Sequence, residues 1–162
     1  MARGIMYEIV SETKLKLGDT DICKLKEEDL YDYVGAEFNY CQDCDRKDGV
    51  SELMDYFKNS DFETGTDKLE VNGEMEDIPY IIVTLEAKEA YFKKCYEEFM
   101  EKVKGITLEK FATDTYDISQ LIAETYGDAA RLDGLIYWSF DNCIRSLEPG
   151  EKYYFGNTVY MH

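Results

Sequence analysis

The pattern of apolar and polar positions predicts a strand that leads directly into the longest helix of the chain. Ile78–Thr84 is a short run rich in β-branched residues and has the length of a strand. Thr84 can cap a helix, and apolar residues then recur at four-residue steps until Gly105. These residues are Ala87, Tyr91, Cys95, Phe99 and Val103. Because such a stripe must be buried, we expect this unit to form the core of one domain.

The residues before this unit predict one strand and two helices. Ile5–Glu12 alternates like a strand, with Ile5, Tyr7 and Ile9 on one face. A helical pattern begins at Lys26 and places Leu30, Val34 and Phe38 four residues apart. Cys41–Asp48 is typical of a polar turn. Behind Asp48 as a cap, a second helix presents Val50, Leu53, Met54 and Phe57 on one face, and Asn59–Asp67 is predicted to be a loop.

Two hairpins are predicted from turn sequences. Asn72-Gly73 within Leu69–Met75 suits a type I′ turn. Gly156-Asn157 is expected to join a second hairpin at the end of the chain. The other elements expected after the long helix are a short helix that opens at Asp117–Gln120 and ends at Gly127, a strand at Leu135–Trp138, a helix at Phe140–Leu147, and the hairpin strands Lys152–Phe155 and Thr158–Met161.

Interspersed strands and helices, with several strand pairs formed by hairpins, predict an α+β fold. We expect a mixed or mainly antiparallel sheet packed against about four helices. Residues 1–162 are most simply one domain, and two small subdomains with a boundary near 59–67 are the alternative. The N-terminus lacks the apolar run of a signal peptide, and no apolar segment is long enough to span a membrane. We therefore expect a cytoplasmic protein with no membrane partner and with reduced thiols at its five cysteines.

The usual catalytic signatures are missing from the sequence. His162 is the only histidine, and a terminal residue cannot hold a catalytic imidazole in place. No glycine-rich phosphate loop is present. Cys41 and Cys44 have the spacing of half a zinc site or of a redox dithiol, but no second cysteine pair follows them and their acidic neighbours raise a thiol pKa. We expect no catalytic residues, no metal site and no cofactor.

The strongest signal is the distribution of charge. The chain carries a net charge of −17, and residues 27–77 hold 17 acidic and four basic side chains. This net charge of −13 is comparable with the phosphates on one face of a DNA duplex of the protein's own length, at about one phosphate per 1.7 Å. Such a segment should repel nucleic acid and attract a basic nucleic-acid-binding cleft. A solubilising role is the alternative interpretation.

The C-terminal third adds a weak likeness to a known family. Tyr137-Trp-Ser-Phe140 followed by Arg145-Ser-Leu147 resembles a Tyr-x-x-Tyr…Arg-Asp-Leu stretch near the end of antirestriction proteins, with Phe140 and Ser146 as departures. The length of the chain, its acidity and its many tyrosines are similar to those of the antirestriction DNA mimics and of some anti-CRISPR proteins of phages and mobile elements. In that family distributed surface charge carries the function, so the resemblance supplies no catalytic residue.

The resulting hypothesis is an acidic inhibitor that occupies the nucleic-acid-binding site of a basic nuclease or of its complex, with no direct binding of nucleic acid. An acidic regulatory domain with another protein partner, or an enzyme without a recognisable motif, are the alternatives. The residues expected to contact the partner are Glu27, Glu28, Asp29, Asp32, Glu37, Asp43, Asp45, Asp48, Glu52 and Asp55.

Overall fold

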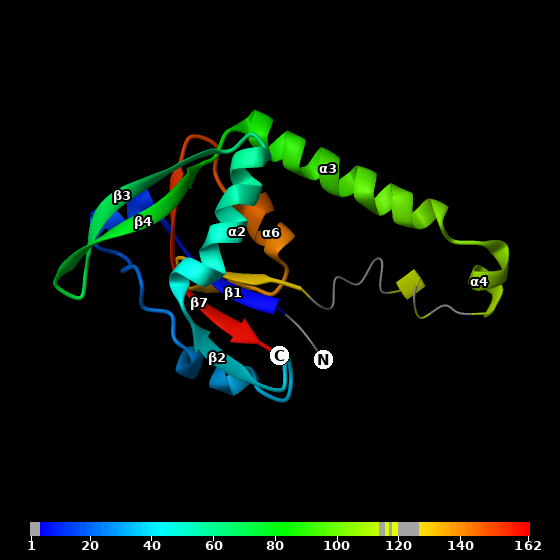
Figure 1. The fold of residues 1–162 in the computed structure, drawn as a ribbon, viewed down its shortest axis with the longest axis horizontal. Helices are drawn as coiled ribbons and strands as arrows, with labels where there is room; N and C mark the ends of the chain where they lie inside the picture. Colours follow the sequence, from blue (N-terminus) through cyan, green and yellow to red (C-terminus); the bar gives the residue numbers. More distant parts are fainter. Residues whose placement is uncertain (1–3, 114–115, 117, 120–126) are drawn as a thin grey trace.

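The fold is built on a seven-stranded sheet whose central strand is the last one in the chain (Figure 1). The computed structural model describes residues 4–113, 116, 118–119 and 127–162. The strands are β1 (Gly4–Ser11), β2 (Cys41–Cys44), β3 (Glu63–Val71), β4 (Glu74–Ile82), β5 (Ala129–Leu132), β6 (Leu135–Tyr137) and β7 (Lys152–Met161). Their order is β3-β4-β7-β1-β5-β6, and β2 pairs with the second half of β7. Only the β1–β5 pair is parallel among these named strands, so the predicted α+β class with a mainly antiparallel sheet is confirmed.

Six helical elements lie in the described part of the chain, more than the four or so that the sequence predicts. They are α1 (Glu12–Leu17), the 3-10 helix η1 (Glu27–Tyr33), α2 (Arg46–Asn59), α3 (Leu85–Lys104), α4 (Leu108–Thr113) and α6 (Phe140–Ser146). Among the described residues, no helix is both long enough and apolar enough to cross a bilayer.

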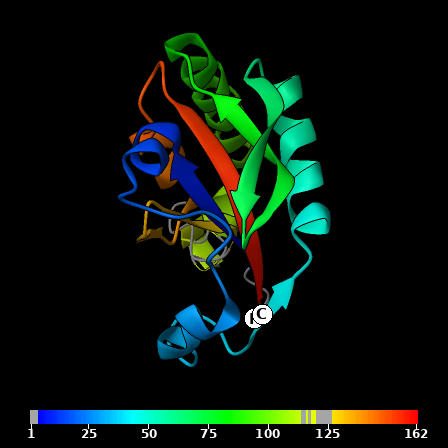
Figure 2. The ribbon, with the colours of Figure 1, turned by 90° about the vertical axis from the view of Figure 1, so that its left-hand side faces the viewer.

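The two faces of the sheet have different cores. On one face α2, α6 and the first turns of α3 cover Tyr7 and Ile9 of β1 and Phe155 of β7. On the other face η1 and the segment before it cover Met6 and Met161. Because successive side chains of a strand point to opposite faces, the alternation of β1 supplies both cores at once, as the sequence predicts for Ile5, Tyr7 and Ile9. Figure 2 shows α2 and η1 on opposite sides of the strands.

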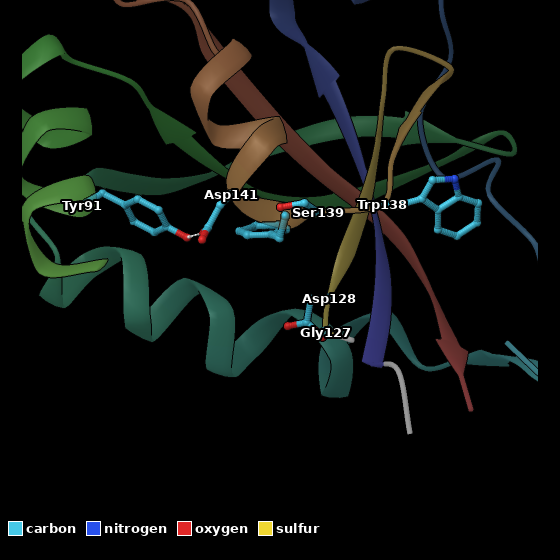
Figure 3. Close-up of a pocket in the computed structure, with 7 residues that line it drawn as sticks. Tyr91, Gly127, Asp128, Trp138, Ser139 and Asp141 are labelled. Atoms are coloured by element: carbon cyan, nitrogen blue, oxygen red, sulfur yellow. Dashed lines mark hydrogen bonds between the residues drawn. The ribbon is translucent and has the colours of Figure 1, made fainter. Parts of the chain in front are cut away.

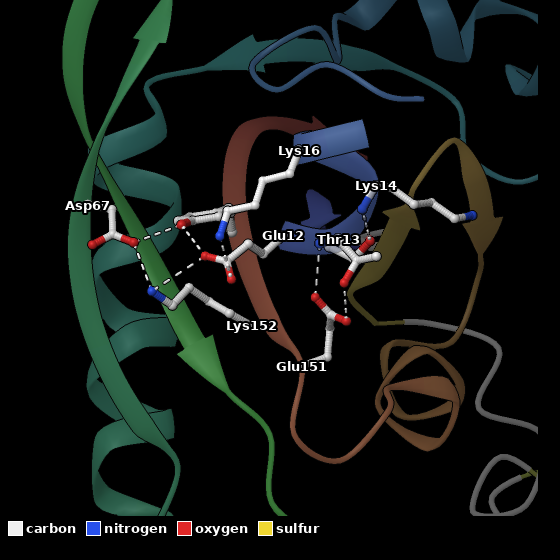
Figure 4. A network of polar contacts seen from close by, with 9 residues as sticks. Glu12, Thr13, Lys14, Lys16, Asp67, Glu151 and Lys152 are labelled. Atoms are coloured by element: carbon white, nitrogen blue, oxygen red, sulfur yellow. Dashed lines mark hydrogen bonds and ion pairs between the residues drawn. The ribbon is translucent and has the colours of Figure 1, made fainter. Parts of the chain in front are cut away.

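A polar network ties the N-terminal segment to β7 and to the hairpin β3–β4 (Figure 4). The Lys152 ammonium lies 2.9 Å from Asp67 and 3.7 Å from Glu12. The Tyr154 hydroxyl donates to the same two carboxylates, at 2.7 and 3.1 Å. Glu151 accepts hydrogen bonds from the backbone and the hydroxyl of Thr13. The acidic groups of this network are therefore matched by a cation or by hydrogen-bond donors.

The hairpin β3–β4 confirms the strongest turn prediction. Asn72 and Gly73 have φ angles of 52° and 85°, and positive φ at both central residues is what a type I′ turn requires. Glycine adopts this conformation without steric cost, and asparagine tolerates it better than most residues. The loop predicted at 59–67 is shorter than expected, because β3 already begins at Glu63.

The long helix forms where the sequence predicts it, but it is not the core. Thr84 caps α3 through a bond from the Ala87 N–H, and Gly105 follows its last residue. Ala87 and Tyr91 are buried, whereas Phe99 is 37% exposed, because the helix leaves the body after its first turns and projects outward (Figure 1). The expectation that the whole stripe is buried is therefore wrong, and β1 and β7 hold the central position instead.

Two local predictions before the long helix also fail. The helix expected from Lys26 is only the 3-10 turn η1, and Val34 is 43% exposed beyond its end. The polar turn predicted at Cys41–Asp48 is in fact the strand β2, followed by α2 from Arg46 with Asp45 as its cap. The cap therefore lies three residues earlier than predicted, while the buried face of α2 at Val50 and Phe57 is confirmed.

The terminal hairpin predicted at Gly156-Asn157 is also wrong, because β7 is one continuous strand. The register between β7 and β1 shifts between Tyr7 and Ile9 of β1. Gly156 and Asn157 of β7 therefore both lie opposite Glu8, and they form a bulge. The Glu8 carboxylate accepts the Asn157 N–H at 2.8 Å, and a Cβ at Gly156 would collide with it. The short helix predicted to open at Asp117–Gln120 lies largely outside the described residues, while the elements predicted at Leu135–Trp138 and Phe140–Leu147 are confirmed as β6 and α6.

Candidate functional site: exposed carboxylates and a cavity

The ten acidic residues predicted to contact a partner follow a continuous path through the fold. The path starts on η1, crosses β2 and continues along α2. Glu27, Glu28, Asp29 and Asp32 lie on η1, Glu37 in the loop behind it, Asp43 on β2, Asp45 at the cap of α2, and Asp48, Glu52 and Asp55 on α2. Because η1 lies on one side of the sheet and α2 on the other, the carboxylates of η1 and those of α2 form two groups, which β2 connects along the chain.

Four of these carboxylates have structural roles inside the protein. Glu27 and Asp43 exchange hydrogen bonds between their carboxylates and each other's backbone N–H groups. Asp29 accepts the Lys26 N–H and lies 3.5 Å from the Arg131 guanidinium. Asp45 accepts the Lys47 N–H at the start of α2. Part of the acidity therefore serves the fold.

Five others form what we call the acidic stripe: Glu28, Asp32, Asp48, Glu52 and Asp55. All five are exposed, and within the described part of the chain none of them forms an ion pair with a basic side chain. Asp48, Glu52 and Asp55 are separated by four and three residues, which places them on one face of α2. Glu52 and Asp55 lie beyond the first turn, where a helix dipole gives a carboxylate little stabilisation.

The basic residues of α2 do not neutralise this stripe. Arg46 points inward, where its guanidinium donates to Glu76 at 2.6 Å and to the Cys23 sulfur at 2.8 Å. Lys47 lines a separate pocket between α2 and β4, together with Asp77 and Pro79. Lys47 and Lys58 are also exposed on α2, but neither forms an ion pair with these carboxylates among the described residues.

The cysteines do not build a metal or redox centre with the acidic residues. Cys41 and Cys44 lie three apart on β2, so they point to opposite faces. The Cys44 sulfur lies 2.9 Å from the Thr158 hydroxyl, and the Cys41 thiol contacts the Glu27 carbonyl. Burial, with smaller contributions from Glu27 and Asp43, raises the pKa of Cys41. All five cysteines are free, and no group of three metal ligands occurs among the described residues.

A cavity of about 280 Å³ lies beside the start of α6 and the buried end of α3, where β5 begins and β6 ends (Figure 3). The residues that line it are Tyr91, Gly127, Asp128, Trp138, Ser139, Phe140 and Asp141. The Tyr91 hydroxyl donates to Asp141 at 2.5 Å, and Asp128 accepts the Ile5 N–H at 2.9 Å. The Trp138 ring points away from the other labelled side chains and packs on Tyr33.

Sequence reasoning does not find this cavity, because its side chains come from segments far apart in the chain. Ser139 carries the only local signal, since its hydroxyl accepts the Asn142 N–H and caps α6. Nothing local marks Tyr91, Asp128 or Asp141 as neighbours. Three residues of the stretch 137–147 line the cavity, namely Trp138, Ser139 and Phe140, whereas Leu147 is buried and serves the core.

Comparison with known proteins adds no family to this description. No family model matches the chain, and neither the curated proteins nor the solved structures contain a significant match.

Proposed function

We propose that this protein is an acidic inhibitor that occupies the nucleic-acid-binding site of a basic nuclease, in the manner of antirestriction DNA mimics or anti-CRISPR proteins. The observation that carries the proposal is the acidic stripe: five exposed carboxylates, without ion pairs to basic side chains in the described structure, two on η1 and three on one face of α2. Charge of this kind is costly to the fold because it repels itself, and a basic partner would relieve that cost.

The spacing of the carboxylates supports this proposal. Asp45, Asp48, Glu52 and Asp55 span about 15 Å of helix at 1.5 Å per residue, or about one carboxylate per 5 Å. One strand of B-form DNA presents a phosphate about every 3.4 Å of axis. The charge density along α2 is therefore of the same order as that of a single DNA strand, on a rigid support.

The residues that line the cavity do not indicate any class of enzymatic reaction, so the cavity does not favour an enzyme over this proposal. Within the described residues it holds no histidine, no thiol and no basic side chain. Its two carboxylates already accept hydrogen bonds from Tyr91 and Ile5.

The test is inhibition of a restriction endonuclease and of an RNA-guided nuclease by the wild-type protein and two charge variants. The stripe variant changes Glu28, Asp32, Asp48, Glu52 and Asp55 to their amides and spares the four structural carboxylates. The control variant makes the same charge change at exposed positions on α3 and α4, namely Glu86, Glu89, Glu97, Glu98 and Glu109. Both variants should fold, because none of the ten side chains is buried.

We expect the stripe variant to associate with an inhibited nuclease at least about tenfold more slowly, and the control variant to change the rate by much less. Inhibition by the wild type should weaken steeply with salt, since the attraction is screened over about 10 Å at 0.1 M. Inhibition that survives the stripe variant would refute the proposed surface. If neither nuclease is inhibited and binding ignores salt, an acidic regulatory domain with another partner replaces this function.

A further inference from the structure

Five large apolar side chains on α3 and α4 are exposed to solvent. They are Leu85, Tyr96, Phe99, Leu108 and Phe111, and their exposed fractions lie between 37% and 85%. α3 leaves the body after its first turns, and α4 lies at its outer end (Figure 1). A contiguous exposed apolar patch of more than a few hundred Å² is rare on a monomeric domain and marks an interaction site.

On α3 the exposed side chains belong to one row of residues, which we call the apolar row. It consists of Leu85, Phe92, Tyr96, Phe99 and Val103. Its members are separated by seven, four, three and four residues, so they share one face of the helix, with the spacing at which two helices pair in a coiled coil. Phe92 also packs against the core, but Leu85 points away from the buried face, because it lies two residues from Ala87.

α3 and α4 also differ from the rest of the chain in charge. Residues 85–113 contain six acidic and six basic side chains, so the net charge of −17 lies entirely outside them. Part of this charge is paired within α3, since the Lys104 ammonium lies 3.3 Å from Glu101. A basic partner is therefore not attracted to this region, and a second acidic copy of the chain is not repelled by it.

The shape of the molecule favours one orientation for such a second copy. If the two α3 helices were parallel, the two acidic bodies would lie next to each other and repel. α3 has 20 residues and is about 30 Å long, so an antiparallel pair places the bodies at opposite ends. This separation exceeds the Debye length of about 8 Å at physiological ionic strength, and the repulsion is then largely screened.

An antiparallel pair also matches the apolar row with itself. When the twofold axis passes between Tyr96 and Phe99, Tyr96 of one copy faces Phe99 of the other. Phe92 then faces Val103 of the other copy at the same spacing. Every contact forms twice, as a twofold dimer requires.

The same register also accounts for the exposed side chains outside the middle of α3. Leu85 of one copy lies at the level of α4 of the other. Leu108 and Phe111 of α4 are three residues apart, so they share a face that can cover Leu85.

The exposed apolar area is sufficient for a weak dimer. At about 150–250 Å² for a large side chain, the five exposed residues present roughly 500 Å² per copy. Two copies that cover each other would bury roughly 1,000 Å², which is the lower limit for a specific interface. We therefore expect a dissociation constant on the order of tens of micromolar.

We propose that α3 and α4 form a dimerisation arm, along which two copies of this chain pair in antiparallel orientation through the apolar row. This pairing does not rest on the proposed inhibition of a nuclease. The dimer holds one acidic stripe at each end of the paired arms, so it presents two separated binding surfaces of the same kind.

The first test is sedimentation equilibrium of the full chain from about 1 to about 300 µM. We expect the mass to rise from the chain mass of 18.9 kDa toward twice that value. Small-angle X-ray scattering at the highest concentration should show a second maximum in the distance distribution, beyond the diameter of one body. A monomer at every concentration would overturn the proposal, because the apolar row would then be covered within the chain or by another partner. A compact dimer without the second maximum would overturn the antiparallel arrangement.

Two variants of α3 test the apolar row itself. Tyr96→Gln combined with Phe99→Gln removes its two exposed aromatic rings without changing the charge, and should raise the dissociation constant at least about tenfold. Glu97→Gln combined with Glu101→Gln, on the opposite face of α3, is the control and should change it by less than about twofold. Both double variants should fold, because all four side chains are exposed, and unfolding at about 1 µM reports the single chain. An unchanged dissociation constant for the aromatic variant would refute the pairing through this row.

Salt separates this proposal from the proposed function. Dimerisation should persist or strengthen as salt rises, because burial of apolar surface drives it and salt screens the repulsion between the bodies. Inhibition of a nuclease through the acidic stripe should weaken under the same conditions. A dimer that dissociates as salt rises would refute the apolar interface, whereas loss of inhibition by the stripe variant with dimerisation intact leaves it standing.

Discussion

Glu27 and Asp43 each accept the backbone N–H of the other, at 3.1 Å from the Asp43 N–H and 2.6 Å from the Glu27 N–H. Like charges are thus brought together across η1 and β2 because each satisfies a backbone donor that would otherwise lack a partner. Two of the residues predicted to contact a partner therefore hold η1 against β2. A charge map alone cannot separate such residues from the acidic stripe.

The first prediction contrasts Glu27 with its neighbour Glu28. Glu27→Ala should destabilise the protein by about 1–2 kcal/mol, because the Asp43 N–H loses its acceptor. Glu28→Ala removes an exposed carboxylate with no ion pair among the described residues, and should change the free energy of unfolding by less than about 0.5 kcal/mol. Urea unfolding at neutral pH measures both. Equal effects would mean that the paired hydrogen bonds do not contribute to stability.

The second prediction concerns the buried carboxylate of Glu8, which is 2% exposed. It accepts the N–H groups of Lys24, Leu25 and Asn157, and so joins the segment before η1 to the bulge of β7. Glu8→Ala should cost about 3 kcal/mol, because it leaves buried donors unsatisfied and opens a cavity. Urea or thermal unfolding measures the loss.

The control for Glu8 is Glu70→Ala, an exposed glutamate on the outer strand β3, which should be nearly neutral. A loss below about 0.5 kcal/mol for Glu8→Ala would show that the bulge forms without the carboxylate.

The third prediction is a pH dependence from the network in Figure 4. Hydrogen bonds from Tyr154 and then Lys152 hold the pKa of Asp67 below its ordinary value of 3.8. A carboxylate whose pKa is lower in the folded state adds stability above its unfolded pKa, and that stability is lost as pH falls through the folded pKa. Asp67→Asn should therefore be less stable than the wild type at pH 7.

The difference between Asp67→Asn and the wild type should shrink as the pH falls below about 4. Urea unfolding of both proteins from about pH 7 to pH 2 measures it. A gap that stays constant over this range would mean that the charge of Asp67 does not contribute.

The fourth prediction follows from the exit of α3 from the body. Tyr91 is buried and bonded to Asp141, whereas Phe99, two turns further on, is exposed on the projecting part. Tyr91→Ala should cost about 3 kcal/mol or more, and Phe99→Ala less than about 1 kcal/mol. Chemical unfolding of the two variants gives both values. A comparable loss for Phe99→Ala would show that its ring is covered in solution.

Predictions that depend on neighbouring residues hold in this fold. Asn72-Gly73 sets its own turn, and Thr84 caps the helix that follows it. Gly156-Asn157 has an equally strong turn signal, yet it forms a bulge because Glu8, almost 150 residues earlier, supplies an acceptor. The apolar residues of α3 are likewise buried near the start of the helix and more exposed toward its end, and no local pattern distinguishes the two parts.

The acidity of residues 27–77 follows from the sequence, because net charge is a property of composition. Which of these carboxylates bond within the protein could not be predicted, since Asp43 and Asp29 are engaged by Glu27 and Arg131 through the tertiary fold. The sequence does not indicate the cavity for the same reason, since Tyr91, Asp128 and Asp141 lie in separate segments of the chain.

The position of β7 has a consequence for biosynthesis. This strand joins β1 on one side to β4 and β2 on the other, yet it follows all of them in the chain. A ribosome therefore releases β1, α2 and the β3–β4 hairpin before the strand that connects them exists. A nascent chain shorter than about 150 residues cannot close the sheet, and leaves the edges of β1 and β4 open to other chains. The sheet is consequently completed only when β7 emerges.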